Sequence, residues 1–262
     1  MFHRRDHTAE FPSGSRILCL PPRHSEPGWP ILRGGAQALP DALARYLEDL
    51  GGRVEIDHEV TQLPETDLIL ADITPRQLLR IAGSQLPSHY CRRLERFRYG
   101  AGAFKIDYAL SAPIPWTAPE CSRAATVHIG GSLEEIAESE RTFTSDRPFV
   151  LLGQPSLFDS SRAPVGQHTA WAYCHVPNGS AKDYTELIER QIARFAPEFR
   201  DCILARSISS PAALERWNPN LIGGDFFGGH NGYPTASLPS HTLTLPHRRK
   251  PTSQVTKRAR QR

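Results

Sequence analysis

The sequence lacks long apolar runs and paired cysteines, and each absence excludes a class of protein. The longest apolar runs are short, as at 148–152, so we expect no membrane-spanning segment. No apolar stretch follows the arginines near the N-terminus, so we expect no signal peptide. The five cysteines are widely spaced and form no Cys-x-x-Cys pair, which excludes a zinc ribbon or a thioredoxin motif. An odd cysteine number without a signal peptide predicts a cytoplasmic, reducing location.

The common cofactor and nucleophile motifs are missing as well. The chain has no Gly-x-Gly-x-x-Gly, no Walker loop and no Gly-x-Ser-x-Gly elbow. Gly100-Ala101-Gly102 comes nearest to a dinucleotide loop, but it precedes an expected strand, whereas a Rossmann loop follows one. The segment 223–229 is dense in glycine without a Lys-Ser/Thr ending, and we interpret it as a flexible turn.

Charge is nearly balanced but unevenly spread. The chain has 31 basic and 28 acidic side chains, a net charge of +3. Residues 230–262 hold seven Lys or Arg and no acid, which leaves a net −4 elsewhere. We expect this basic tail to be disordered and solvated, without specific nucleic-acid binding.

The first third of the chain predicts two helices and two short strands after an irregular start. Residues 1–33 lack periodicity and are expected to be irregular. Apolar spacing predicts a helix from about Leu39 to the glycines at 51–52. Alternation at 53–57 and the apolar run at 67–71 predict strands, and Thr74 before Pro75 predicts a helix N-terminus.

The middle of the chain predicts a mixed body of strands and helices. Five strands are expected, at 104–110, 125–129, 149–152, 169–175 and 203–208. Ser132 and Glu135 form a capping box for a helix to about residue 140, and Asp183 with Glu186 forms a similar box. The fold class expected is therefore α/β of the mixed α+β kind.

Several polar side chains are candidates for chemistry. Lys105 and Asp107 share one strand face, and they form either a surface ion pair or a polar pair that lines a cleft. His128, His168 and His175 lack helical i, i+4 pairing, so we interpret them as structural histidines and expect no metal site. Trp171, Tyr173 and His175 share one side of their strand, whereas Cys174 points to the opposite side, which excludes a thiolate–imidazole pair.

Motifs spread over residues 28–229 resemble one family of flavoproteins. Gly34-Gly35-Ala36-Gln37-Ala38-Leu39 resembles a Gly-Gly-x-x-x-Leu helix start, and the match continues through Val60. It also includes the segments 104–110, 126–131, 170–177 and 218–225. The family is the phytoene desaturase-like NAD(P)/FAD-dependent oxidoreductases, in the flavin-containing amine oxidase superfamily.

The resemblance implies a two-domain FAD-dependent oxidoreductase fold, with a mixed substrate-domain sheet, flanking helices and an incomplete Rossmann-like FAD domain. The N-terminal dinucleotide fingerprint and the C-terminal flavin motif are missing, as in an internal fragment. The implied segments are an irregular extension at 1–33, a partial FAD-binding domain at 34–82, a substrate-binding domain at 83–210, a return segment at 211–229 and a basic tail at 230–262.

The function implied is FAD-dependent oxidation or desaturation of an apolar small molecule, with hydride transfer to the flavin. The candidates for cofactor binding are Gly34, Gly35, Gln37 and Val60. The candidates for substrate binding are Lys105, Asp107, His128, Trp171 and Tyr173. No catalytic residue is assigned.

An alternative is a non-catalytic remnant or substrate-domain interaction module that does not bind FAD by itself. The missing phosphate-binding glycines favour it. A homodimer or a partner chain would then cover the incomplete FAD domain. Peripheral contact with a membrane is a further expectation.

Overall fold

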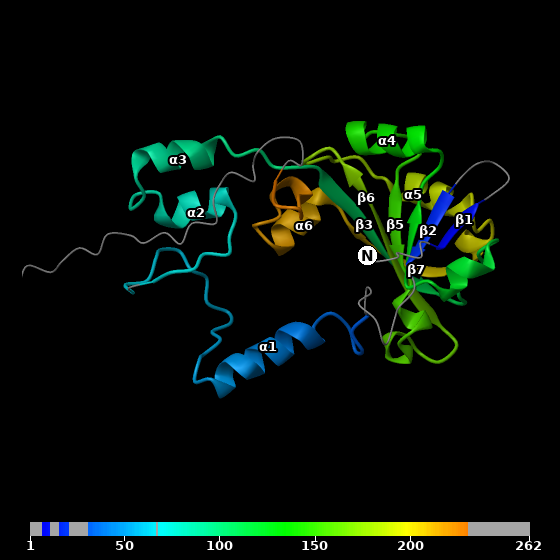
Figure 1. The fold of residues 1–262 in the computed structure, drawn as a ribbon, viewed down its shortest axis with the longest axis horizontal. Coiled ribbons are helices and arrows are strands. Elements are labelled where there is room, and N and C mark those ends of the chain that lie inside the picture. The colour runs from blue at the N-terminus through cyan, green and yellow to red at the C-terminus, as the bar shows by residue number, and fades with distance from the viewer. Residues whose placement is uncertain (1–6, 11–15, 21–30, 67, 230–262) are drawn as a thin grey trace, which may run out of the picture. The chain divides into compact units, whose positions relative to one another are not determined.

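A computed structural model of the chain describes residues 7–10, 16–20, 31–66 and 68–229 (Figure 1). The chain packs as two compact units. One unit comprises the described residues up to His58 and from Arg98 onward, and the other comprises Glu59–Phe97. The basic tail expected at 230–262 lies outside the described residues. The domain boundaries implied by the resemblance stay predictions, because these units are defined by packing alone.

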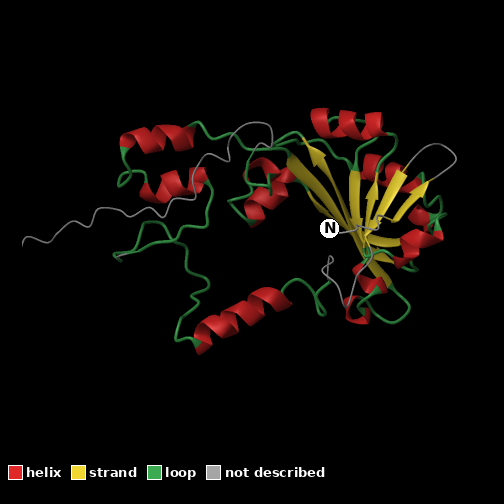
Figure 2. Ribbon diagram, in the orientation of Figure 1, coloured by secondary structure: helices red, strands yellow, loops and turns green. Residues whose placement is uncertain are grey.

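The first unit is built on one antiparallel sheet, drawn in yellow in Figure 2. Among the described residues it has seven strands in the order β1-β2-β4-β5-β6-β3-β7. Their bounds are β1 His7–Glu10, β2 Arg16–Leu20, β3 Gly102–Leu110, β4 Thr126–Ile129, β5 Val150–Gly153, β6 His168–Val176 and β7 Ile203–Ser209. The mixed α/β class is therefore confirmed, and the five expected strands are present.

Two strands lie where the sequence analysis expected irregular chain. β1 pairs with β2, and β2 continues the sheet from β4. Neither strand was expected, because four or five residues without a clear apolar alternation give little periodic signal. The backbone groups of β2 pair with the edge of β4, and those of β1 pair with β2, which no local pattern reveals.

One face of the sheet carries the core of this unit. Alternate residues of β3 are buried, from Phe104 to Leu110, and the same holds for Ala170 to Val176 in β6. Ile188 and Ile192 of α5 are fully buried in the same cluster. Each such apolar side chain stabilises the fold by roughly 1.5–3 kcal/mol relative to an exposed one. Lys105 and Asp107 lie on the other face, as the alternation predicts.

Most of the expected helices form. The helices are α1 Ala38–Asp49, α2 Pro75–Ala82, α3 Ser88–Glu95, α4 Leu133–Thr142, α5 Thr185–Ala193 and α6 Pro211–Trp217. Pro40 lies in the first turn of α1, and Pro75 begins α2 after the N-cap Thr74. The box expected at Asp183 and Glu186 is wrong. The N-cap is Tyr184, and Asp183 accepts a hydrogen bond from the Thr185 amide in a two-residue turn.

The two strands expected in the first third of the chain are not present. Residues 53–57 have no regular structure, and neither do the described residues of 67–71. Ile56 and Leu70 are exposed there. Alternation alone does not make a strand, because an extended segment needs a neighbour to pair its backbone groups.

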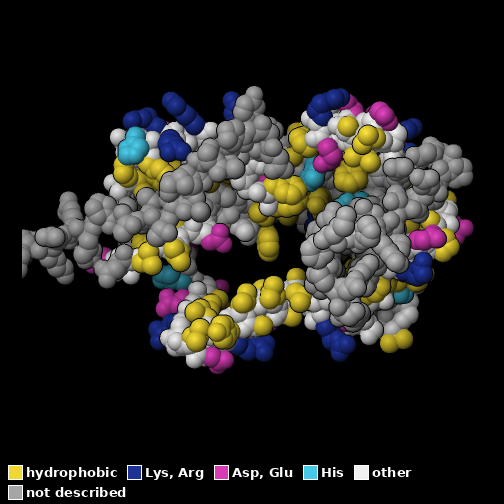
Figure 3. Space-filling model, in the orientation of Figure 1, with side chains coloured by type: hydrophobic (Ala, Val, Ile, Leu, Met, Phe, Trp, Pro, Cys, Tyr) yellow, Lys and Arg dark blue, Asp and Glu magenta, His cyan; other side chains and the backbone are white. Residues whose placement is uncertain are grey.

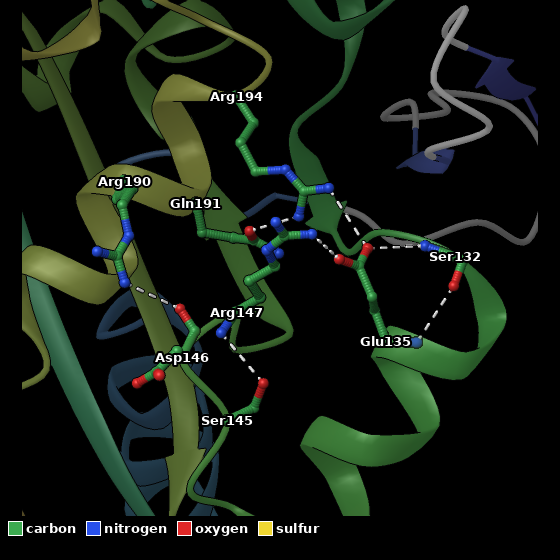
Figure 4. A network of polar contacts seen from close by, with 8 residues as sticks. All are labelled: Ser132, Glu135, Ser145, Asp146, Arg147, Arg190, Gln191 and Arg194. Atoms are coloured by element: carbon green, nitrogen blue, oxygen red, sulfur yellow. Dashed lines mark hydrogen bonds and ion pairs between the residues drawn. The ribbon is translucent and has the colours of Figure 1, made fainter.

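A charged network joins α4 to α5, as Figure 4 shows. The capping box of α4 is confirmed, since the Ser132 hydroxyl accepts from the Glu135 amide and Glu135 accepts from the Ser132 amide. The Glu135 carboxylate also pairs with Arg147 and with Arg194, which caps the end of α5. Arg147 holds the pKa of Glu135 below its ordinary value, so this carboxylate stays charged. The network thereby fixes α4 at one end of the sheet.

Two regions carry little of the core. Helix α1 has no buried residue, and an apolar stripe along it is exposed, seen in yellow in Figure 3. In the second unit, α2 and α3 enclose a small cluster around Ala82, Leu86 and Leu94. None of the helices in the described ranges is both long and apolar enough to cross a bilayer.

Candidate functional site

The face of the sheet opposite the core carries two rows of side chains, and we call it the open face. One row crosses four neighbouring strands. Lys105 of β3 pairs in register with Tyr173 of β6. Tyr173 pairs with Leu151 of β5, and Leu151 pairs with His128 of β4. In the next row Asp107 is the partner of Trp171. The five substrate-binding candidates therefore share one face, although they come from three strands. Their role in binding stays a prediction.

Two aromatic rings lie along β6 on this face. Trp171 and Tyr173 are stacked, with ring centroids 6.2 Å apart and an angle of 13° between the planes. The Trp171 indole lies over Gly153 of β5, where an added Cβ atom would come within 2.3 Å of the ring. The glycine therefore lets the indole lie flat on the sheet.

Lys105 and Asp107 form an ion pair beside these rings. Their side chains are 34% and 46% exposed, so water screens the pair and it adds little to stability. This partial exposure fits both a surface ion pair and a polar pair beside a binding surface, so the structure does not decide between the two alternatives. The pair places two charged side chains beside the aromatic rings of the open face.

His175 continues the aromatic row and has a carboxylate partner. Its Nδ1 lies 2.6 Å from Oε2 of Glu140, which α4 brings over the end of β6. The Phe143 ring packs edge-on against the imidazole, with centroids 6.2 Å apart. The expectation for His175 was a structural histidine, and sequence spacing gave no sign of Glu140, which is 35 residues away.

The glycine-dense loop at 223–229 packs against the aromatic side chains of β6. The buried Asp225 carboxylate accepts hydrogen bonds from the amides of Gly100, Phe227 and Gly228. The glycine-dense segment was interpreted as a flexible turn, but this carboxylate anchors it. The sequence feature that could have indicated an ordered turn is Asp225 itself, because an Asp side chain often accepts hydrogen bonds from the amides two and three residues later in the chain.

The anchored loop brings two phenylalanines to the open face. Phe226 packs edge-on against Tyr173 with centroids 5.2 Å apart, and Phe227 lies 5.2 Å from His175. The two phenylalanine rings are themselves 4.4 Å apart. Together with Trp171 they complete an aromatic cluster, which we define as Trp171, Tyr173, His175, Phe226 and Phe227.

Burial sets the protonation of several groups in these strands. It lowers the pKa of His128, whose ring packs edge-on against Phe149. It raises the pKa of Tyr173, with a smaller contribution from the Glu140 charge. Burial also raises the pKa of the Cys174 thiol to about 12, so Cys174 stays a neutral core residue. The described part of the chain has no group of three metal-ligating side chains.

Three of the cofactor-binding candidates lie at one turn, where their donors already have partners in the protein. The Gly34 amide donates to Oδ2 of Asp159 at 2.7 Å, and the Gly35 amide donates to a backbone carbonyl. Gln37 donates its side-chain amide to Asp41. The Asp159 carboxylate therefore occupies the anion position at this turn. Val60 belongs to the second unit and is half exposed.

Sequence comparison relates the chain to curated mammalian proteins. It is 23% identical to pyridine nucleotide-disulfide oxidoreductase domain-containing protein 2 of Rattus norvegicus, over 77% of this chain and 42% of that protein. The Mus musculus protein of the same name is 24% identical over the same shares. The chain is a distant homologue of these proteins. It spans about two fifths of their length.

The chain was also compared with protein-family models and with solved structures. No protein-family model matches the chain. A solved Pyrococcus furiosus protein is 16% identical with a TM-score of 0.44, covering 67% of this chain and 43% of that one. An oxidoreductase from Methanosarcina mazei is 15% identical with a TM-score of 0.41, covering 67% and 42%. The homology to the curated proteins relates the chain to oxidoreductase-domain proteins in general and does not single out the phytoene desaturases.

Proposed function

We propose that the open face is the substrate-binding face of a flavin-dependent oxidoreductase. The finer proposal is a phytoene dehydrogenase-like activity, which removes hydrogen from an apolar small molecule. The observation that carries it is the aromatic cluster on one face of the sheet, in a chain that is distantly homologous to oxidoreductase-domain proteins.

The chemistry of this face suits an apolar ligand. The nearly parallel rings of Trp171 and Tyr173 form an aromatic platform, with Phe226 standing edge-on against Tyr173. Covering the platform removes apolar surface from water at roughly 25 cal/mol per Å². The Lys105–Asp107 pair lies at the edge of the platform and would orient a polar end of the ligand. In this proposal Trp171 and Tyr173 bind, while Phe226 excludes water.

A bound flavin supplies the hydride acceptor in this class of chemistry. The turn at Gly34 does not present free amides to a flavin, because Asp159 already takes the Gly34 amide and the Leu32 carbonyl takes the Gly35 amide. This observation favours the alternative function, in which the chain forms the substrate side and does not hold FAD by itself. A homodimer or a partner chain would then complete the flavin site.

The substrate-binding proposal is tested with an apolar fluorescent probe. We expect 2-methoxynaphthalene to bind the full chain and to lose at least about tenfold in affinity in Trp171→Ala, because the platform is lost. Trp217→Ala removes an exposed tryptophan of α6 and serves as the control, with unchanged affinity. Equal binding by wild type and Trp171→Ala would remove the basis of the proposal.

Flavin retention separates the two functions. The purified chain is mixed with FAD, desalted and measured by visible absorption. Retained flavin supports the chain as an FAD-binding oxidoreductase, and a colourless protein supports the substrate-side module. Light scattering on the same sample shows whether a homodimer is formed. A cytoplasmic location and peripheral membrane contact belong to the same proposal and are tested by cell fractionation.

A further inference from the structure

Three buried polar atoms at the open face have no hydrogen-bond partner among the described residues. They are Nε2 of His128, Nε2 of His175 and Oε1 of Glu140, and the last two belong to one contacting pair. The His175 side chain is only 16% exposed. A buried polar atom without a partner is costly, so native proteins rarely leave one without a role.

The contact between the two side chains fixes what the free nitrogen can do. The Glu140 carboxylate only accepts hydrogen bonds, so the proton shared over the 2.6 Å contact belongs on Nδ1 of His175. A second proton on Nε2 would be a buried donor without an acceptor. With its one proton on Nδ1, the neutral form of the ring presents a lone pair at Nε2. This is the arrangement in which a carboxylate orients a histidine for use at its far nitrogen.

None of the described side chains that pack against His175 donates a hydrogen bond to Nε2. The rings against His175 are Tyr173 of the same strand, Phe143 at the end of α4, and Phe226 and Phe227 of the anchored loop. The titratable groups that face the imidazole are Glu140 from α4 and Tyr173 from β6. No cation from these elements takes the lone pair.

We propose that Nε2 of His175 receives a hydrogen bond from a hydroxyl or amine group of the ligand that lies on the aromatic cluster. The ligand class is thus an apolar, ring-bearing molecule with one hydrogen-bond donor, and Glu140 is the positioning residue that holds the histidine tautomer. This inference rests on the proposed function, because it requires the open face to bind an apolar molecule.

Two partly exposed rings of the anchored loop pack against the imidazole, with centroids 6.2 Å away for Phe226 and 5.2 Å away for Phe227. Phe226 and Phe227 are 41% and 49% exposed, so neither ring is locked in a core. Their backbone is held by Asp225, which accepts from the Phe227 and Gly228 amides. The inference requires the phenyl rings to turn away from the imidazole when the ligand binds, while Asp225 keeps the loop backbone in place.

The test compares two probes that differ in one donor. 2-Naphthol carries a hydroxyl donor, and 2-methoxynaphthalene has the same rings with the donor blocked by a methyl group. Both are titrated into the full chain and followed by their fluorescence. We expect 2-naphthol to bind about tenfold more tightly, because only it satisfies the buried nitrogen.

Three variants locate the effect. His175→Phe keeps a ring of similar size and removes the acceptor, so we expect equal affinities for the two probes. Glu140→Gln replaces the pure acceptor with an amide that can donate to Nδ1, and we expect a smaller preference for 2-naphthol. Glu138→Gln lies on the same helix in an exposed pair with Arg141 and keeps the wild-type preference.

The outcomes separate this inference from the proposed function. If the wild-type chain binds both probes with equal affinity, the donor preference is overturned, but the proposal that the open face binds an apolar molecule still stands. A preference for 2-naphthol that persists in His175→Phe also overturns it. Binding of neither probe overturns the proposed function as well. If His175→Phe fails to fold, the tautomer measured by ¹⁵N NMR decides: Nδ1–H with a bare Nε2 supports the inference, and the reverse contradicts it.

Discussion

At the scale of single residues, His128 couples the open face to pH. Burial lowers its pKa from the ordinary value of 6.5, so the folded chain resists a proton that the unfolded chain accepts. The stability present above about pH 6.5 is therefore lost progressively as the pH falls below it. We expect His128→Gln to lose less stability than wild type between about pH 7 and pH 5, measured by urea unfolding.

The exposed His58 provides the matched control for this prediction. His58→Gln removes a histidine of the same unit and should keep the wild-type dependence of stability on pH. An unchanged dependence in His128→Gln would show that its burial does not affect folding.

Asp225 is the residue on which the aromatic loop depends. Its carboxylate is the acceptor for three backbone amides, and the Gly100 bond is buried. Asp225→Ala leaves buried donors unpaired, so we expect a loss of about 1–3 kcal/mol in the free energy of unfolding. Asp201→Ala, at an exposed position, should change it by less than about 0.5 kcal/mol. Chemical denaturation of the two variants measures both, and equal effects would contradict the anchoring role.

Some of the site is visible in the sequence and some is not. Alternation places Trp171, Tyr173 and His175 on one side of their strand, and the structure confirms it. The partners that give these residues their setting come from distant segments. Glu140 and the Phe226–Phe227 pair were not predicted as part of the site. The sequence of a helix with a carboxylate, or of a glycine-rich loop, is the same whether or not that segment contacts the sheet.

At the scale of elements, α4 positions the carboxylate of the His175–Glu140 pair. Its N-terminus is held by the Ser132–Glu135 capping box. Ser132→Ala removes an acceptor from the first turn, and we expect a loss of about 0.5–2 kcal/mol in the free energy of unfolding. The exposed Ser160 makes no such cap, so Ser160→Ala should be close to neutral. Thermal unfolding compares the two, and a neutral Ser132→Ala would show that α4 is held by its packing alone.

The elements that were predicted correctly have a local sequence pattern that is typical of their structure. β3 and β6 show full apolar alternation, and α4 has a capping box. β2 is defined by its pairing to β4 and β1 by its pairing to β2, whereas the described residues of 53–57 and 67–71 pair with no strand. Periodicity shows which face of a segment is apolar, but the presence of a pairing edge decides whether a strand forms.

At the scale of the whole molecule, the two units have separate apolar clusters. The cluster of the second unit is small and includes the buried Leu94. We expect Leu94→Ala to speed amide exchange across α2 and α3, because it removes a large share of this cluster, while exchange in β3 and β6 is unchanged. Hydrogen exchange with mass spectrometry measures both. Faster exchange in β3 would show that the units unfold together.

The central claim concerns one surface of the chain, the aromatic cluster on the open face. The chain spans 42% of its curated rat relative, so the claim is made for the substrate side and not for a complete enzyme. It requires that an apolar molecule lies against Trp171 and Tyr173 and not along the exposed stripe of α1.

Hydroxyl-radical footprinting with mass spectrometry tests this most directly. The chain is oxidised with and without saturating 2-methoxynaphthalene. The account predicts that oxidation of Trp171, Tyr173 and Phe226 falls when the probe is bound, while oxidation of the exposed Trp217 stays the same. Protection confined to Leu43 and Tyr46 of α1, with Trp171 unchanged, would contradict it.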